Sequence, residues 1–185
     1  MSFPRKPDKP RAALAEPALY DYAVKALGRR MRTEAELRRL IAARAAPGEA
    51  GQAAVKSVLA QLKERRYLDD RSYAETYARL RQENDKLGSR KVRQKLAEKG
   101  VPSSIAQKAI DERYAGADEE ALARAHLERK RIARPANEKE TARVVRRLAV
   151  AGFSTGVIYK ILRNWNVSDD ALAALDSPND EPGTE

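Results

Sequence analysis

Apolar residues recur three and four positions apart along most of this chain, which is the spacing of amphipathic helices. The stretch 67–100 shows it best and predicts two helices separated by a break near Gly88. The apolar stripe of the first predicted helix consists of Tyr73, Ala74, Tyr77 and Leu80. The second helix places Val92 and Leu96 on one face, and Gly100 ends it because glycine accepts a left-handed turn.

Start signals support further helices on both sides of this stretch. Thr33 with Glu36 and Asn137 with Glu140 have the spacing of capping boxes, in which each side chain bonds the other residue's amide. Single polar residues are expected to cap three other helices, because short oxygen-bearing side chains accept from free first-turn amides; these residues are Asp69 or Asp70, Ser89 and Ser154. The helical pattern itself begins near Ala18.

An internal repeat of roughly 50 residues appears when the predicted helices are aligned. Five positions match at identical spacing: Val92, Leu96, Gly100, Ile105 and Ala109 correspond to Val144, Leu148, Gly152, Val157 and Ile161. The same pattern recurs, with about five extra residues at the loop 47–51, in Leu37, Ile41, Ala45, Val55 and Leu59. One such helix triplet buries too little surface to be stable alone, so neighbouring triplets are expected to share interfaces.

These patterns predict an all-α protein, an elongated tandem array of three three-helix repeats without a β-sheet. The expected repeats span 18–66, 67–116 and 117–167. Residues 1–17, rich in proline and basic side chains, are expected to form a disordered arm. Residues 168–185 are expected to hold a short helical turn and an acidic disordered tail.

Composition narrows the function more than the fold. The formal net charge is +10 and charged residues make up 35% of the chain, which favours a polyanionic partner. The absence of cysteine excludes disulfides, thiolate zinc sites and cysteine nucleophiles. The opening residues lack the apolar run of a secretory signal, and no run is long enough to span a bilayer. We therefore expect a cytoplasmic protein with no membrane partner.

Signs of catalytic chemistry are few. His126 is the only histidine and has no carboxylate neighbours at ligand spacing, so we interpret it as a solvated or partly packed side chain. Asp69 and Asp70 could bind a metal, but helix capping and the helix dipole explain them as well. No Walker, dinucleotide-binding or nucleophile-elbow motif is present. The prediction is a protein that is not an enzyme and that needs no cofactor or metal.

Basic side chains recur on the second helix of each predicted triplet, with another cluster between the second and third. A charge run is often only a solvated face, but recurrence in register favours contact with a repeating polyanion. The candidate binding residues are Arg38, Arg39, Arg79, Arg90, Lys91, Arg93, Lys95, Arg129, Lys130, Arg131, Arg143, Arg146 and Arg147. Aromatic residues are sparse at 5%, which disfavours sequence-specific reading of single strands.

The central stretch resembles the RecX family, the regulators of the bacterial RecA recombinase. The resemblance rests on Tyr67-Leu68-Asp69-Asp70, Tyr73-Ala74, Arg79, Gly88, Arg90, Leu96 and Lys99-Gly100-Val101. A weaker similarity covers Ala26–Leu40, and the whole extends over roughly residues 18 to 165. Two positions depart from the pattern: Arg66 stands where a glycine commonly precedes the Tyr-Leu-Asp-Asp run, and Tyr73 replaces a frequent phenylalanine.

This resemblance implies a three-repeat, all-helical regulator that lies in the groove of the RecA–DNA filament, and we expect the protein to be a monomer. Members of the family mainly inhibit RecA, limiting its ATPase, strand exchange and filament growth in DNA repair, homologous recombination and the SOS response. The implied partners are the RecA filament and single- and double-stranded DNA. Two alternatives stay open at this point: a general, sequence-independent DNA-binding helical protein, and a hydrolase that uses Asp69 and Asp70.

Overall fold

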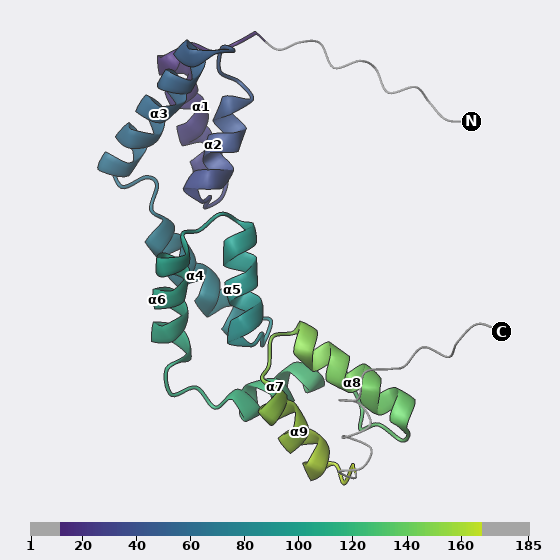
Figure 1. Cartoon of the computed structure of the whole chain (residues 1–185). Coiled ribbons are helices and arrows are strands. Elements are labelled where there is room, and N and C mark those ends of the chain that lie inside the picture. The colour runs from purple at the N-terminus through teal and green to yellow at the C-terminus, as the bar shows by residue number, and fades with distance from the viewer. Residues whose placement is uncertain (1–11, 168–185) are drawn as a thin grey trace, which may run out of the picture. The chain divides into compact units, whose positions relative to one another are not determined.

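The computed structural model describes residues 12–167, and within that range the chain forms nine α-helices and no strand (Figure 1). An isolated parallel bridge joins Leu14 to Ala45. The all-α prediction is confirmed. The helices are α1 (Glu16–Arg29), α2 (Glu34–Ala42), α3 (Glu49–Glu64), α4 (Asp70–Glu83), α5 (Ser89–Glu98), α6 (Ser103–Tyr114), α7 (Glu119–Arg129), α8 (Glu138–Val150) and α9 (Thr155–Asn164).

The chain divides into two compact units. The first contains the residues up to Tyr73 together with Lys99–Pro102, and the second contains Ala74–Glu98 and the residues from Ser103 onward. In the first unit α1, α2 and α3 pack on one another. In the second, α5 packs on α6, and both α7 and α8 pack on α9.

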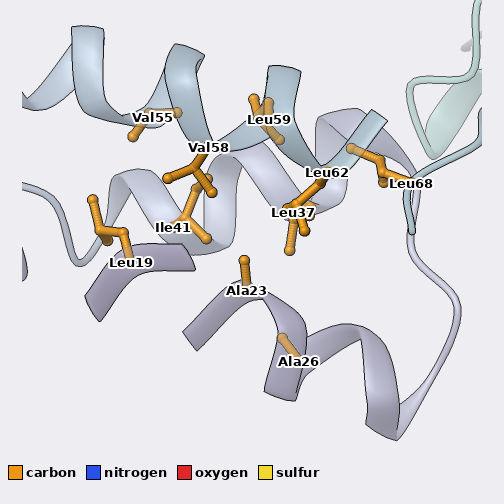
Figure 2. Close-up of a cluster of buried hydrophobic side chains, with 10 residues drawn as sticks. All are labelled: Leu19, Ala23, Ala26, Leu37, Ile41, Val55, Val58, Leu59, Leu62 and Leu68. Atoms are coloured by element: carbon orange, nitrogen blue, oxygen red, sulfur yellow. The ribbon is translucent and has the colours of Figure 1, made fainter. Parts of the chain in front are cut away.

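A single apolar cluster holds the first unit together. Figure 2 shows its side chains converging from α1, α2 and α3, with Leu68 joining from the segment after α3. Because apolar burial is the main favourable term in folding, this cluster accounts for the packing of the three helices. Its ten buried members are Leu19, Ala23, Ala26, Leu37, Ile41, Val55, Val58, Leu59, Leu62 and Leu68.

A second cluster lies between α7, α8 and α9. Phe153, in the turn between α8 and α9, is its largest member and is 2% exposed. The other buried members are Ala123, Leu127, Val144, Leu148, Ala151, Ile158, Ile161 and Leu162. His126 lies beside this cluster, with its ring edge-on to Phe153 at a centroid distance of 5.8 Å.

The matched repeat positions occupy equivalent environments. Val92 and Val144 are both buried, at 0% and 4% exposure, and Leu96 and Leu148 are both fully buried. Gly100 and Gly152, each two residues beyond the end of a helix, have positive φ angles of 78° and 92°. The pattern therefore aligned α5 with α8 correctly. The repeat boundaries 18–66, 67–116 and 117–167 stay a prediction.

The capping predictions are largely confirmed, with one return bond that differs. Thr33 accepts from the Glu36 amide at 3.1 Å and Asn137 accepts from the Glu140 amide at 3.0 Å, as predicted. The return bond of the second box differs, since the Glu140 carboxylate accepts from the Ala136 amide at 2.8 Å, and the Glu36 carboxylate of the first box also pairs with Lys99 at 3.0 Å. Ser154 accepts from the Val157 amide at 3.5 Å.

Other local predictions need correction. Leu80 is 39% exposed, whereas Ala78, which was not predicted, is fully buried like the predicted Ala74, so the predicted apolar stripe was wrong at its end. Helix α5 begins at Ser89 itself, and α1 begins at Glu16, two residues before the predicted Ala18. The predicted arm 1–17 overlaps the described range only from residue 12, and the turn and tail predicted for 168–185 lie outside it.

Candidate functional site

The thirteen candidate basic residues fall on five helices and one helix end. Eleven are exposed, and Lys91 and Lys95 are half-buried. They come from α2 (Arg38, Arg39), α4 (Arg79), α5 (Arg90, Lys91, Arg93, Lys95), α7 (Arg129), the segment after α7 (Lys130, Arg131) and α8 (Arg143, Arg146, Arg147).

Several of these cations already have acidic partners on their own helix. Arg38 pairs with Glu34 at 2.5 Å, Arg79 with Glu83 at 3.2 Å, and Lys95 with Glu98 at 2.7 Å. Exposed pairs of this kind contribute little to stability, but each partly neutralises a positive charge. These side chains are therefore weaker candidates for phosphate contact than side chains without a carboxylate neighbour.

Arg129 has an architectural role in the second unit. Its Nε donates to the Asn84 carbonyl at 2.6 Å and its guanidinium also reaches the Asp85 carboxylate at 3.2 Å. His126, one turn earlier on α7, places Nδ1 3.2 Å from the Asp85 carbonyl and 3.1 Å from the Lys86 carbonyl. Together they satisfy carbonyls that follow the end of α4, which a helix end otherwise leaves without partners.

His126 is more enclosed than the sequence indicated, at 5% exposure. Burial lowers the pKa of His126, against the carbonyl bonds that favour the charged ring, and the nearby cations Lys130 and Arg129 lower it further. The neutral ring with its proton on Nδ1 fits this position, since that nitrogen faces two carbonyl acceptors. The solvated interpretation was therefore wrong, while the packed one is correct.

A groove with a volume of about 580 Å³ lies in the second unit. Four cationic side chains line it: Lys91, Lys130, Arg146 and Arg147. Within residues 12–167, Lys130, Arg146 and Arg147 have no ion pair, whereas Lys91 bonds Gln94 at 2.9 Å. The rest of the lining is Leu87, His126, Ile132, Val150 and Ala151, so no acidic side chain of the described chain lines this groove.

Sequence reasoning identified the cations of this groove but missed its apolar part. Val150 is 61% exposed although it is a large aliphatic residue. It lies four positions after Arg146 on α8, so the two share a helix face. An apolar residue on the basic face of α8, away from the stripe of Val144 and Leu148, was the available signal.

The acidic pair after α3 serves as two helix caps. Asp69 accepts from the Arg71 and Ser72 amides of α4 at 2.8 and 3.3 Å, and its bond from the Ser72 hydroxyl is the main cause that lowers the pKa of Asp69. Asp70 accepts from the Glu34 amide at the start of α2, at 2.8 Å. Burial raises the pKa of Asp70 despite that bond. Asp69 and Asp70 therefore both act as helix caps.

Lys99, in the segment after α5, contacts the start of α2. The Thr33 hydroxyl donates to the Lys99 carbonyl at 2.6 Å, and the Lys99 ammonium pairs with Glu36 and lies 5.9 Å from the centre of the Tyr73 ring. The bond to Glu36 raises the pKa of Lys99. Asp70 and Lys99 of the motif therefore both contact α2 within the first unit, while Asp69 caps α4.

Among the described residues, no helix has the length and apolar character needed to cross a membrane.

Comparison with known proteins identifies the family. The regulatory protein RecX of Thermus thermophilus is 33% identical over 149 residues, which cover 80% of this chain and 91% of that protein. The chain belongs to the RecX family. The regulatory protein RecX of Cronobacter sakazakii is 36% identical over 157 residues, covering 80% of this chain and 92% of that relative.

A family model and two solved structures agree with this assignment. The model of the second three-helix domain of RecX matches residues 69–110, which contain the cap Asp69 and helices α4 and α5. The crystal structure of RecX from Lactobacillus salivarius aligns with a TM-score of 0.67 and 19% identity, covering 82% of this chain and 96% of that chain. A second RecX crystal structure aligns with a TM-score of 0.67, 23% identity and coverage of 80% and 71%. At these identities the structures support the fold alone.

Proposed function

We propose that this RecX-family protein regulates the RecA recombinase, mainly as an inhibitor, by binding along the RecA–DNA filament. The observation that carries the proposal is its match, over four-fifths of its length, to relatives named as regulatory proteins. The proposed contact groups are the candidate cations without a carboxylate partner. The proposal includes a monomeric protein in the cytoplasm that acts in DNA repair, recombination and the SOS response.

The charges of the second unit support contact with a polyanion. Arg143, Arg146 and Arg147 follow one another on exposed positions of α8, and none has an ion pair with a residue in the range 12–167. Forming a phosphate contact there breaks no ion pair within the described residues. Counterion release would make each such contact favourable and salt-dependent.

The first experiment measures the DNA-dependent ATPase of RecA from the same source with increasing amounts of this protein. We expect inhibition at amounts well below one protein per RecA monomer, because contacts along one chain reinforce each other through effective concentration. The control is a DNA-dependent ATPase unrelated to RecA, on the same DNA. Equal inhibition of both enzymes, or none of either across a wide concentration range, would contradict a RecA-directed role.

A second candidate function is sequence-independent DNA binding without preference for RecA. It is favoured by the net charge of +10 alone. The two functions differ in a competition experiment, in which the labelled protein distributes between bare DNA and RecA-coated DNA of equal length. Preference for the coated DNA supports the filament regulator, and preference for the bare DNA supports the second candidate.

A further inference from the structure

The groove between α5, α7 and α8 combines two properties that few exposed surfaces share. Its apolar lining includes Leu87, Ile132 and the exposed Val150, while cations of α8 and of the segment after α7 surround it. Exposed apolar surface next to charge is typical of an interaction site. A ligand that covers the aliphatic side chains and also places carboxylates beside Lys130, Arg146 and Arg147 would satisfy both properties.

The chain itself contains such a ligand directly after the described residues. The segment 168–176 reads SDDALAALD, with Asp169, Asp170 and Asp176 around two leucines, Leu172 and Leu175. The leucines are three positions apart, so they lie on one face wherever the segment is helical. Residues 168–185 include six acidic residues and neither lysine nor arginine, whereas the chain as a whole carries +10.

The attachment point makes an intramolecular contact feasible. Val167 lines a pocket with Asn137 and Thr141 at the start of α8, and the groove lies at the other end of the same helix, with Val150 about 14 Å from Thr141 along the helix axis. Nine residues span up to about 30 Å when extended and about 14 Å as a helix, so the residues before Leu172 must be extended for a helical turn with both leucines to reach Val150. A short tether also raises the effective concentration of the segment at the groove to about the millimolar range.

We propose that the segment 168–176 binds in this groove, with Leu172 and Leu175 against the apolar lining and its aspartates beside the cations. The bound segment covers Arg146 and Arg147 and so competes with any polyanion for them. The contact between the segment and the groove does not depend on the proposed function. The effect of that contact on regulation rests on the proposed function. A polyanion that displaces the segment gains those cations only by breaking the intramolecular contact.

The absence of cysteine makes a direct test possible. The double variant Val150→Cys with Leu175→Cys is oxidised mildly in the full chain, and the disulfide-linked monomer is measured on a non-reducing gel. We expect faster linkage than in Val150→Cys with Thr184→Cys, and loss of that advantage when Arg146→Glu and Arg147→Glu are added. Equal rates in the two pairs, or linkage into dimers, would overturn the intramolecular contact.

A second measurement tests the competition with a duplex DNA probe. The variant Asp169→Asn, Asp170→Asn, Asp176→Asn is compared with Asp180→Asn, Glu181→Gln, Glu185→Gln, which changes the net charge by the same three units. We expect the first variant to bind DNA at least about threefold more tightly than the second, since it frees the groove. Equal affinities, or no binding to DNA by any variant, would overturn the competition. Disulfide linkage without inhibition of the RecA ATPase would contradict the proposed function while leaving the contact intact.

Discussion

Four residues beyond helix ends show how single positions shape this molecule. Arg66, Arg131, Gly152 and Asn166 all have positive φ angles. Each is followed by a residue whose amide reaches back to the helix, as Tyr67 does to the Leu62 carbonyl at 2.9 Å. This is the Schellman arrangement, in which a left-handed residue lets the chain turn while the last carbonyls keep their bonds. Only one of the four is glycine, so the other three side chains adopt a backbone conformation that L-residues disfavour.

Replacing Arg66 by glycine is expected to stabilise the first unit. Arg66 has a φ of 58° and is exposed, so the substitution removes backbone strain and no buried contact. We expect the free energy of unfolding to rise by about 1 kcal/mol, measured by urea denaturation followed by circular dichroism. Arg66→Ala is the control, because it removes the same charge but keeps the strain. Equal stability of the two variants would show that the charge and not the backbone matters.

The resemblance to the RecX family pointed to this position, because Arg66 stands where a glycine commonly precedes the Tyr-Leu-Asp-Asp run. The capping roles of Thr33 and Asn137 were also predicted from the sequence. The bond between Lys99 and the Glu36 carboxylate was not predicted, because Lys99 is 63 residues away in sequence. Local spacing identified Thr33 and Asn137 as caps, whereas long-range packing determines the partner of the Glu36 carboxylate.

At the scale of elements, two turns of the second unit meet backbone to backbone. The Gly88 amide, just before α5, donates to the Ala151 carbonyl, at the end of α8, at 2.9 Å. A Cβ atom on Gly88 would lie 2.3 Å from the Gly152 oxygen, and one on Gly152 would lie 2.3 Å from the Lys91 nitrogen. Helices α5 and α8 therefore approach through turns that leave no room for a side chain.

Gly152→Ala is expected to destabilise the second unit by more than about 2 kcal/mol, because the added methyl collides with backbone and the φ angle of 92° is strained for alanine. Trp165, the only tryptophan, packs against the apolar cluster of this unit and gives a local fluorescence signal during urea unfolding. Gly156→Ala is the matched control. Gly156 lies in α9 with open space around it, so alanine there is expected to be neutral or up to about 1 kcal/mol stabilising. Similar losses in both variants would contradict the close approach.

The sequence predicted the helices themselves well, since the 3.6-residue period of α5, α8 and α9 follows from their buried aliphatic residues. The prediction of the buried face was less accurate for α4. Tyr77 and Leu80 have helical spacing, but the buried residue between them is Ala78. Arg81 lies over the Tyr77 ring at 4.8 Å, so that aromatic side chain contacts a cation instead of joining a core. Periodicity identifies a helix, but small residues that pack closely can replace the large ones in the core.

At the scale of the whole molecule, the net charge of +10 comes from two kinds of basic residue, those with a partner in the described chain and those without one. Arg38, Arg79 and Lys95 each have a carboxylate on the same helix, while Arg129 donates to the Asn84 carbonyl, 45 residues away in sequence. Arg143, Arg146 and Arg147 have no ion pair in the described part of the chain. The sequence could locate all of these charges. It could not separate them fully, because the partners of Arg129 are distant in sequence.

This difference predicts unequal effects of equal charge removal on DNA binding. Arg143→Ala, Arg146→Ala and Arg147→Ala together lower the net charge by the same amount as Arg38→Ala, Arg79→Ala and Lys95→Ala together. If the α8 set contacts phosphates, its loss should reduce the slope of log affinity against log salt concentration by about 3, since each phosphate contact contributes about 0.9. The paired set should change that slope by less than about 1. Each of its cations is already partly neutralised by a carboxylate on the same helix, so its removal costs little phosphate contact. The slopes come from titrations of a labelled duplex between roughly 50 and 200 mM salt. Circular dichroism of both variants checks that the helices are kept. Equal reductions of the slope would mean that the net charge governs attraction to DNA and that pairing has no effect.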